Sequence, residues 1–524
     1  SLTATYKYCI ITPMATDLLL ISAPLRPMEY PPMALALLKS ILHRNGYDVA
    51  LSDAGLEYWK HCGGTNSEFM LRSMGIQNLS ARSMEDIDAS DFGVWTRAYV
   101  KRLLAEHRPR AVGISVFTYV SNLAAYYMGR VIREMAPKGT RMMIGGFGAS
   151  SRLQFPEALG APDRPSLAET MRDQGIIDTY ILGDGERAIV EFMKNLDMVQ
   201  PDQLHKIKDF DGIPAPDYSD LDIGSYQFKN NLTLPVTGSK GCVRRCTFCD
   251  IPDLFGKYVQ RDGVDMANEC IHLYEKYGAK TLYLTDSLVN GSMKAYMDFI
   301  TTLAELKAKR NIKDLQWTGQ YITRPAHQIP HDRDYYALMA ASGAVGVSVG
   351  AESGSNRVLK HMDKKMKVED LFTELDHFRK HRITMVPNVL QSYPTETRED
   401  FEDTIKMIKG WQTYLADGTI EQVGSIPWWY TNDGLNRWRN VGPEQGMYHM
   451  ATHADRHHWW YRPNPELTLR ERVFRRLALS KIVSEMRMPI SMDENYEIKR
   501  MLMWYETNRE RNEKWTAGIK GHND

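Results

Sequence analysis

Short apolar runs alternate with helical segments along the first two hundred residues, and this alternation restricts the possible folds more than any other feature. The strand-length runs cover residues 18–21, 47–52, 111–115, 141–144 and 176–182. The helical stretches between and after them cover residues 33–45, 121–136 and 187–196, and an irregular insertion of loops and helices is expected at 60–95. Strands that alternate with helices form parallel, doubly wound sheets. The sequence therefore predicts an α/β, Rossmann-like domain over residues 1–205.

Small and polar residues follow several of these strands, where ligands of doubly wound sheets bind. The candidate ligand contacts are Ser22, Ser115, Thr118, Gly145, Gly146, Gly183, Gly185 and Glu186. A glycine has no Cβ and lets a ligand approach the backbone closely, although each glycine alone is also explained by a tight turn. No Gly-x-Gly-x-x-Gly pattern lies between the first strand and its helix, so this is not a dinucleotide fingerprint.

Three of the six cysteines lie within eight residues, at Cys242, Cys246 and Cys249. Three thiolates on one loop can bind three irons of a 4Fe–4S cluster and leave the fourth iron open to another ligand. The alternatives are three unrelated cysteines or a zinc site, but zinc would need a fourth Cys or His at short spacing. The spacing therefore favours an iron–sulfur cluster.

The other cysteines, Cys9, Cys62 and Cys270, are isolated and are interpreted as ordinary thiols. Six cysteines in 524 residues are too few for a disulfide framework, and this indicates a reducing, cytoplasmic location. The longest apolar runs are of strand length, so no membrane segment is expected. Lys and Arg together number 65, as do Asp and Glu, so no global charge favours a nucleic-acid partner.

The cysteine motif, with Phe248 before its last cysteine, resembles the cluster loop of radical S-adenosylmethionine (SAM) enzymes. Further segments resemble this family in the same order, at residues 281–286, 320–324, 346–354 and 388–397. The resemblance implies a partial (β/α)6 barrel over residues 233–415, in which Asp286, Arg324 and Glu352 end strands and bind SAM together with Phe248. At the strand-to-helix turn, Ser392 and Tyr393 replace the glycine usual in the family.

The N-terminal region resembles the cobalamin-binding domain that precedes the barrel in cobalamin-dependent radical SAM methyltransferases. A linker at residues 206–232 would join the two domains. The loop after the first strand contains no histidine, so the resemblance implies cobalamin without a histidine ligand from the protein. Arg26, Met28 and Tyr30 are the loop residues expected to approach the cobalt.

The C-terminal region, residues 416–524, is predicted to be a mostly helical, aromatic-rich cap that binds the substrate. Eight of the eleven tryptophans lie from Trp411 onward. An amphipathic helix is expected at 467–487 and a second helix at 493–513. The run 457–461 is compatible with a metal or heme site, a cavity wall or plain packing. The region has no cysteine, which argues against a second iron–sulfur cluster.

The resemblance implies an enzyme that cleaves SAM reductively at a 4Fe–4S cluster. With cobalamin, it would methylate an unactivated carbon or a phosphorus of a small molecule or natural-product intermediate. A flavodoxin- or ferredoxin-like protein would supply electrons. Two alternatives stay open: a radical SAM enzyme that catalyses a cyclisation or rearrangement, and a non-catalytic iron–sulfur or corrinoid-binding protein.

Overall fold

The computed structural model describes a subset of the chain, in which two compact units are present. The described residues are 15–25, 29–65, 72, 83–150, 165–196, 204–205, 208–210, 212–226, 231–249, 251–330, 334–427, 447–449, 459–461 and 463–486. The first unit is Ser1–Leu234 and the second is Pro235–Asp524. Each unit is described by itself.

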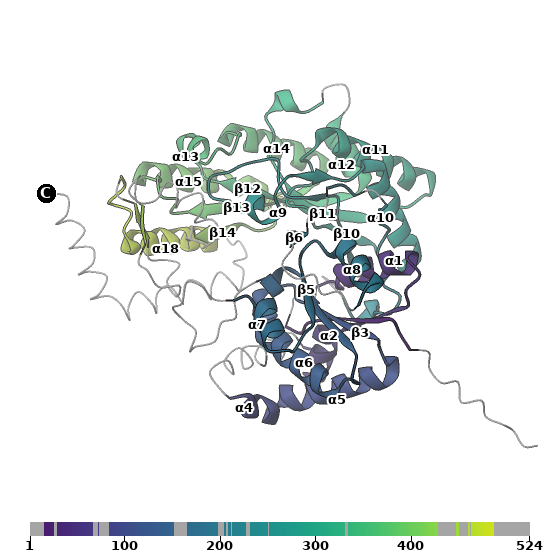
Figure 1. Cartoon of the computed structure of the whole chain (residues 1–524). Coiled ribbons are helices and arrows are strands. Elements are labelled where there is room, and N and C mark those ends of the chain that lie inside the picture. Colours follow the sequence, from purple (N-terminus) through teal and green to yellow (C-terminus); the bar gives the residue numbers. More distant parts are fainter. Residues whose placement is uncertain are drawn as a thin grey trace, which may run out of the picture. The chain divides into compact units, whose positions relative to one another are not determined.

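The first unit contains a six-stranded sheet in the order β2-β1-β3-β4-β5-β6, and its strands pair in parallel (Figure 1). The strands are β1 (Leu18–Ser22), β2 (Val49–Asp53), β3 (Ala111–Ser115), β4 (Arg141–Gly145), β5 (Thr179–Gly183) and β6 (Leu204–His205). The strand order reverses between β1 and β3, so the chain leaves these two strands toward opposite faces of the sheet. Such a reversal opens a crevice at the carboxyl ends of the two strands.

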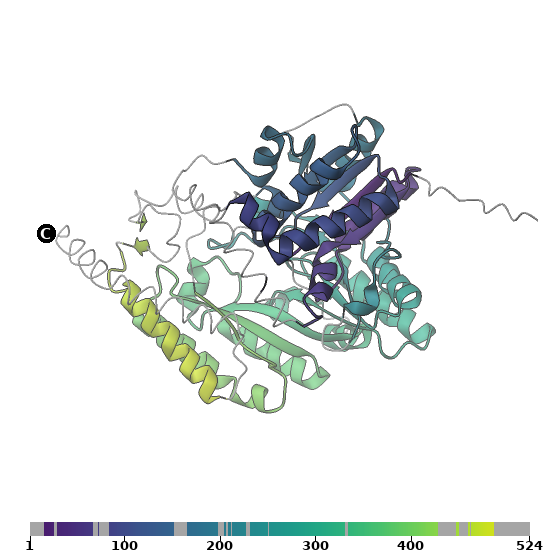
Figure 2. The ribbon, with the colours of Figure 1, turned by 90° about the horizontal axis from the view of Figure 1, so that it is seen from below.

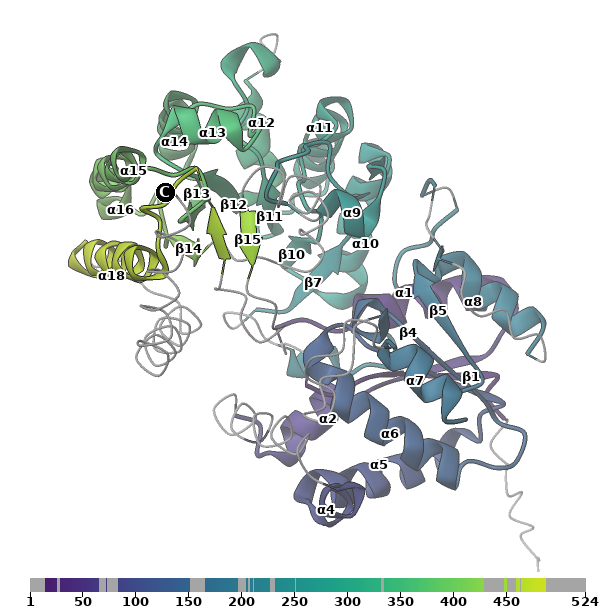
Figure 3. The same cartoon turned by 60° about the vertical axis from the view of Figure 1, so that its left-hand side comes forward.

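Helices cover both faces of this sheet, which confirms the predicted doubly wound α/β fold. They are α1 (Met33–Arg44), α2 (Ala54–His61), α4 (Met84–Ala89), α5 (Asp91–His107), α6 (Asn122–Met135), α7 (Leu167–Asp173) and α8 (Gly185–Lys194). Figure 3 shows α1 and α8 on one face and α5 and α6 on the other. The strands between them are almost fully buried, as continuous apolar strands of a parallel sheet require.

The insertion of loops and helices expected at 60–95 contains α4, and α5 begins within it at Asp91 and runs for 17 residues to His107. Ser90 caps this helix by accepting a hydrogen bond from the Gly93 N–H. Its buried residues include the aromatic Phe92 and Tyr99 and the aliphatic Val100, Leu103 and Leu104. The helix therefore extends beyond the predicted insertion and covers one face of the sheet.

The predicted linker packs against the first unit. Lys39 of α1 is 3% exposed and forms an ion pair with Asp220. The hydroxyl of the fully buried Tyr226 donates a hydrogen bond to the Asp53 carboxylate at the end of β2. Residues 212–226 therefore form part of the N-terminal unit's structure.

The second unit contains six strands in the order β14-β13-β12-β11-β10-β7. They are β7 (Thr233–Val236), β10 (Thr281–Leu284), β11 (Gln316–Tyr321), β12 (Ala344–Glu352), β13 (Thr384–Gln391) and β14 (Gly424–Pro427). The pairs from β10 to β14 are parallel. A partial (β/α)6 barrel was expected, and the predicted boundary at residue 415 falls before its sixth strand.

Helices separate the barrel strands and cover their outer side (Figure 2). They are α9 (Ile251–Phe255), α10 (Gly263–Tyr277), α11 (Met293–Lys309), α12 (Tyr335–Ser342), α13 (Asn356–His361), α14 (Val368–His381), α15 (Arg398–Gly410) and α16 (Gln412–Ala416). This alternation of strands and helices agrees with the expected partial (β/α)6 barrel.

Beyond the barrel, the described residues form the antiparallel pair β15 (Met447–His449) and β16 (Trp459–Tyr461) and the helix α18 (Leu469–Glu485). The helix confirms the prediction at 467–487, but its burial differs from a simple apolar stripe. Arg472, Arg475 and Arg476 are buried, whereas Leu477 is 40% exposed. The second helix expected at 493–513, and residues 457–458 of the aromatic run, lie outside the described residues.

Across the described part of the chain, the structure contains no helix long and apolar enough to cross a membrane.

Candidate active site

The cysteine motif forms a compact loop at the start of the barrel. A short antiparallel pair, β8 (Ser239–Lys240) and β9 (Val259–Gln260), brackets the segment that contains it. Within the loop, the Arg244 N–H donates to Cys242 Sγ at 3.3 Å, and the Cys249 N–H donates to the Cys246 carbonyl at 3.1 Å. The backbone therefore turns back on itself and holds the three cysteines on one loop.

The surroundings of the cysteines suit an anionic ligand. Burial raises the pKa of the Cys242 and Cys246 thiols, and the cations Lys364 and Arg244 oppose this shift by favouring the thiolates. Among the described residues, no three Cys, His, Asp or Glu side chains gather as around a single metal ion. In a 4Fe–4S cluster each thiolate binds a different iron.

Glu352, a predicted SAM contact, lies at the end of β12 and forms a buried ion pair. Its backbone adopts a left-handed conformation with φ of 60°, which non-glycine residues seldom adopt. Lys364 Nζ lies 2.6 Å from Glu352 Oε1, and Gly350 leaves room for this contact because a Cβ there would collide with both groups. Strained backbone of this kind clusters at functional sites.

The sequence interpretation missed Lys364, which connects Glu352 to the cysteine loop. Its ammonium lies 5.8 Å from the centre of the Phe248 ring. Although burial disfavours the charge, Glu352 and Cys246 raise the pKa of Lys364 above its ordinary value. No motif or spacing identified this lysine, since its place in the site depends on the fold that brings it to Glu352 and Phe248. Lys364 and Phe248 therefore both belong to the candidate site.

Asp286 follows β10 and is 2% exposed. Its Oδ2 accepts a hydrogen bond of 2.9 Å from the Gly238 N–H, while Oδ1 is buried without a hydrogen-bond partner. Burial raises the pKa of Asp286 to about 6. The resolved contact fixes the turn that leads into the cysteine loop, and the predicted contact with SAM stays a prediction.

Arg324 lies three residues beyond the end of β11, so the strand expected at 320–324 ends earlier than predicted. Its guanidinium donates to the carbonyls of Asn290 at 2.6 Å and Gly291 at 2.8 Å. Burial and the nearby Arg324 charge lower the pKa of Arg244. Arg324 Nε and Arg244 Nη2 are both buried without a hydrogen-bond partner, so the site contains two cations that an anionic ligand would balance.

Tyr393 is a second residue that sequence reasoning did not place in the site. It is fully buried, and its hydroxyl lies 2.7 Å from Thr247 Oγ1, between Cys246 and Phe248. The neighbouring Ser392 takes the left-handed backbone, with φ of 59°, at the turn where the family's glycine is replaced. The replacement of the family's glycine by Ser392 and Tyr393 was the only sequence feature that pointed to this turn. It marked the turn as unusual but did not indicate that the Tyr393 hydroxyl contacts Thr247.

The predicted residues of the N-terminal unit gather at the carboxyl ends of its strands. Ser22 and Ser115 are paired in register at the ends of β1 and β3, on either side of the strand-order reversal. Thr118, just beyond β3, has its Oγ1 buried without a hydrogen-bond partner. Gly145 ends β4 and pairs with Ser115. These four residues therefore lie along one edge of the sheet.

Loop packing accounts for part of the glycine pattern. Gly146 has φ of 96°, and a Cβ added to it would lie 2.5 Å from the Val116 carbonyl oxygen. A Cβ on Gly148 would lie 2.6 Å from the Thr118 carbonyl oxygen. The loops that follow β3 and β4 are thus packed so closely that a Cβ would not fit at either position. This packing requires glycine there whether or not a ligand binds.

The other predicted ligand contacts of the N-terminal unit lie after β5 and before α1. Gly183 ends β5 with φ of 82°, and Gly185 and Glu186 begin α8. Tyr30 is partly buried just before α1, while Arg26 and Met28 lie outside the described residues. The interpretation did not single out two exposed aromatic residues on the same edge, Phe117 after β3 and Phe147 after β4, with 59% and 53% of their surfaces exposed.

Comparison with known families decides the nature of the barrel. A model described as the radical SAM superfamily matches residues 236–408. The second unit contains a radical SAM domain. Such a domain implies a 4Fe–4S cluster and SAM as cofactors, and the cysteine loop, Asp286, Arg324 and Glu352 all lie within the matched residues.

Curated relatives resemble parts of this chain at low identity. A tRNA-2-methylthio-N(6)-dimethylallyladenosine synthase of Ehrlichia canis is 28% identical over 210 residues, which are 39% of this chain and 44% of that protein. A cytidylyl-2-hydroxyethylphosphonate methyltransferase of Streptomyces wedmorensis is 22% identical over 409 residues, 68% of this chain and 67% of that protein. The chain spans less than half the length of the tRNA-modifying relatives that it matches.

Solved structures share the fold over most of the chain. The radical SAM methyltransferase TsrM of Kitasatospora setae, solved with tryptophan and a SAM analogue, has a TM-score of 0.56 at 18% identity, over 83% of this chain and 78% of that one. The cobalamin-dependent radical SAM enzyme OxsB, solved with aqua-cobalamin, has a TM-score of 0.51 at 14% identity, over 82% and 56%. This likeness confirms the predicted fold of an α/β domain followed by a radical SAM domain.

Proposed function

We propose that the protein is a cobalamin-dependent radical SAM enzyme that methylates an unactivated carbon or a phosphorus of a small molecule. The observation that carries the proposal is the cysteine loop within the radical SAM domain, bordered by the buried Lys364–Glu352 ion pair. The doubly wound N-terminal unit supports it further, because its strand-order reversal provides a ligand-binding edge beside Ser22 and Ser115.

In this proposal Cys242, Cys246 and Cys249 hold three irons. A cluster bound there would leave one iron for the amino and carboxylate groups of SAM and supply the electron that cleaves its sulfonium bond. Lys364 and Glu352 would position the charged groups of SAM, and burial around them would keep water from the reacting atoms. An external flavodoxin- or ferredoxin-like donor would deliver the electron.

Cobalamin is proposed as the ligand of the N-terminal unit, where it would carry the methyl group to the substrate. A second structure of TsrM contains cobalamin together with a 4Fe–4S cluster, at 17% identity to this chain. Ser22, Ser115, Thr118, Gly145 and Tyr30 would contact the cofactor from the sheet edge.

The substrate class is proposed from the chain's charge and from its relatives. TsrM was solved with tryptophan, and the Streptomyces wedmorensis methyltransferase is named for a nucleotide-linked phosphonate. The present chain has no net charge to attract nucleic acid. We therefore propose a small-molecule substrate.

Anaerobic reconstitution of the wild type and of a Cys242→Ala/Cys246→Ala/Cys249→Ala variant tests the cluster. We expect four irons per chain and 5′-deoxyadenosine formation under strong reductant in the wild type, and neither in the variant. Cys62→Ala, a buried cysteine outside the loop, is the matched control and should behave like the wild type. A triple variant that still binds four irons and cleaves SAM contradicts the proposal.

Cobalamin and methyl transfer need their own measurement. We expect a corrinoid spectrum in anaerobically purified protein, and label from methyl-labelled SAM in the product. A protein that binds the cluster but transfers no label would instead support the cyclisation or rearrangement alternative. An intact cluster that never yields 5′-deoxyadenosine would support the non-catalytic one.

A further inference from the structure

The turn between β13 and α15 is held in an unusual conformation by contacts from its own segment. Ser392 adopts a left-handed backbone, and its N–H donates to Glu396 Oε2 at 3.0 Å. Glu396 is 1% exposed, so this carboxylate lies within the protein interior. Thr397 and Asp400 form a capping box that starts α15. The turn therefore depends on a buried acid that needs a compensating partner.

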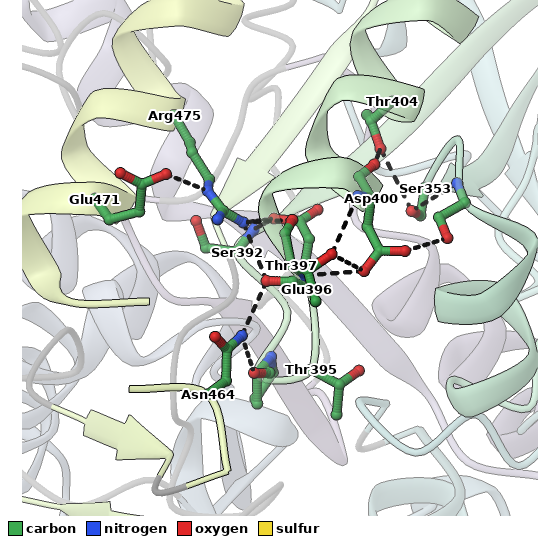
Figure 4. Close-up of polar contacts among 12 residues, drawn as sticks. Ser353, Ser392, Thr395, Glu396, Thr397, Asp400, Thr404, Asn464, Glu471 and Arg475 are labelled. Atoms are coloured by element: carbon green, nitrogen blue, oxygen red, sulfur yellow. Dashed lines mark hydrogen bonds and ion pairs between the residues drawn. The ribbon is translucent and has the colours of Figure 1, made fainter. Parts of the chain in front are cut away.

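The C-terminal segment supplies that partner (Figure 4). Arg475 of α18 is 2% exposed and donates to Glu396 Oε2 at 2.9 Å. Its guanidinium also donates to the carbonyl oxygens of Glu396 and Thr397, at 3.2 and 3.3 Å, while Glu471 binds its Nε at 2.9 Å. One arginine thus contacts both the backbone and the acid of the turn, which a single-point cation would not do.

A second residue of the C-terminal segment contacts the same turn. Asn464 Nδ2 donates to the Pro394 carbonyl at 3.0 Å and to the Glu396 carbonyl at 2.9 Å. Figure 4 shows Asn464 and Arg475 approaching the turn from the two ends of this segment. Asn464 and Arg475 therefore bind both the Glu396 carboxylate and the backbone carbonyls of the turn. We name residues 464–475 the C-terminal latch.

The other side of the turn contacts the cysteine loop. The Tyr393 hydroxyl lies 2.7 Å from Thr247 Oγ1 and 2.9 Å from His361 Nδ1. The Thr247 N–H donates to the Met362 carbonyl at 3.1 Å, so the loop residue between two cysteines is held from two directions. The contact joins residues 146 positions apart in the sequence.

Apolar packing strengthens the same connection. Tyr393, Leu390 and Leu467 belong to one buried cluster with residues of α13. Phe248 of the cysteine loop and Tyr461 of β16 pack against this cluster. The C-terminal segment, the turn and the cysteine loop therefore share one continuous set of contacts.

From these contacts we infer that the C-terminal latch positions the cysteine loop through Tyr393, so that Arg475, Glu396 and Tyr393 are positioning residues for SAM binding at the cluster. The inference rests on the proposed function, because it assigns these residues a role toward that same cluster and SAM. The geometry of the cluster site is thus completed by residues about 225 positions beyond the cysteines. A role in stability alone would change unfolding without changing the cluster's response to SAM.

Tyr393→Phe removes the hydroxyl and little volume, so it tests the connection with minimal disturbance. Its reconstituted form should retain four irons per chain. The electron paramagnetic resonance change that SAM produces in the reduced cluster should differ from that of the wild type. The KM for SAM should rise about fivefold to tenfold, as expected for one lost buried hydrogen bond, with kcat within about twofold. Tyr414→Phe is the matched control, since Tyr414 is also buried and donates to Asp376 at 2.7 Å.

Arg475 variants test the distal end of the latch. Arg475→Met leaves Glu396 without its partner and should alter the SAM-dependent resonance change at least as much as Tyr393→Phe. Arg475→Lys keeps the charge but not the fork of donors, and should restore the wild-type response only in part. Measurements on the folded, cluster-loaded fraction separate these effects from simple loss of folding.

The outcomes of these measurements test the latch inference separately from the proposed function. A wild type that binds no cluster overturns the proposed function and this inference with it. A wild type with a normal cluster, together with Tyr393→Phe and Arg475→Met variants whose resonance change and KM match it, overturns the inference alone. Variants with lowered thermal stability but an unchanged resonance change and KM also overturn the inference, because they give the latch a purely structural role.

Discussion

The two parallel sheets of this protein present different chemistry at their carboxyl edges. The barrel edge carries cysteines and buried charges, including the Lys364–Glu352 pair and the uncompensated atoms of Arg244 and Arg324. The edge of the N-terminal sheet carries glycines, hydroxyl residues and exposed phenylalanines. The same strand–helix architecture therefore presents two kinds of candidate site.

This difference indicates two ways of holding a ligand. A small, charged ligand such as SAM is held by side chains whose charges are buried and paired, because electrostatic interactions are stronger away from water. A large, flat ligand such as a corrin is held by close backbone approach and apolar contact, for which glycine and aromatic residues suffice. Substitutions on the two edges test this comparison.

Replacing Lys364 by Met should have the largest effect, because it leaves the buried Glu352 carboxylate without its partner. We expect the free energy of unfolding to fall by about 3–5 kcal/mol in urea denaturation, together with loss of SAM binding. Lys294→Met removes an exposed ion pair with Asp298 and should leave stability nearly unchanged, because solvent screens the two charges. Equal effects of the two substitutions would show that the barrel edge does not depend on buried charge.

The barrel should lose stability as pH rises, because it buries Glu374 on α14. Burial raises the pKa of Glu374 to about 8, and Thr323 donates a hydrogen bond to its carboxyl group. The unfolded chain releases this proton near pH 4.3, whereas the folded chain holds it to about pH 8. Stability from the protonated group is thus fully present below the lower pKa and is lost between the two values.

Glu374→Gln should remove this dependence. Between pH 5 and pH 8 the wild type should lose about 3–4 kcal/mol relative to the variant in urea unfolding. The N-terminal unit offers a control of opposite sign in Asp88, whose pKa is lowered by Tyr127 and Arg97 despite partial burial. Asp88→Asn should change the pH dependence only at acidic pH, where the lost carboxylate would protonate. Parallel pH profiles of the wild type and Glu374→Gln would contradict the prediction.

The N-terminal edge should instead be sensitive to added volume in its loops. Gly148→Ala places a Cβ 2.6 Å from the Thr118 carbonyl oxygen, so the backbone must move, and we expect a loss of about 2–3 kcal/mol in unfolding free energy. Gly185→Ala is the control, because its nearest neighbour, Leu38, would lie 3.6 Å away. A stable Gly148→Ala variant would mean that the two loops are not packed as described.

The exposed aromatic residues should have the smallest effect, confined to ligand binding. Phe117→Ser and Phe147→Ser should leave unfolding within about 0.5 kcal/mol of the wild type, because more than half of each side chain is exposed. Cobalamin affinity, measured by spectroscopic titration, should fall about fivefold to tenfold for each. Unchanged affinity in both variants would remove the phenylalanines from the proposed cobalamin site.

Prediction from sequence succeeded where the pattern is local. The strands β1 to β5 of the N-terminal sheet were placed within a few residues, since short apolar runs followed by small or polar residues mark them. It missed the part of α5 that lies beyond residue 95, and it extended the third barrel strand to Arg324, although that strand ends at Tyr321. The exposure of Leu477 was also unforeseen, because the buried arginines of α18 take the positions expected for apolar residues.

The sequence alone determined the two α/β regions and the cysteine loop, because spacing and periodicity are properties of neighbouring residues. Only the tertiary structure decided which distant groups meet: Lys364 with Glu352, Tyr393 with Thr247, and Arg475 with Glu396. Buried charges and hydroxyl groups need hydrogen-bonding or charged partners. Those partners come from segments that only the fold brings together, so local sequence patterns do not predict them. The cysteine motif therefore indicates the proposed chemistry, while the contacts that shape its site became visible only in the fold.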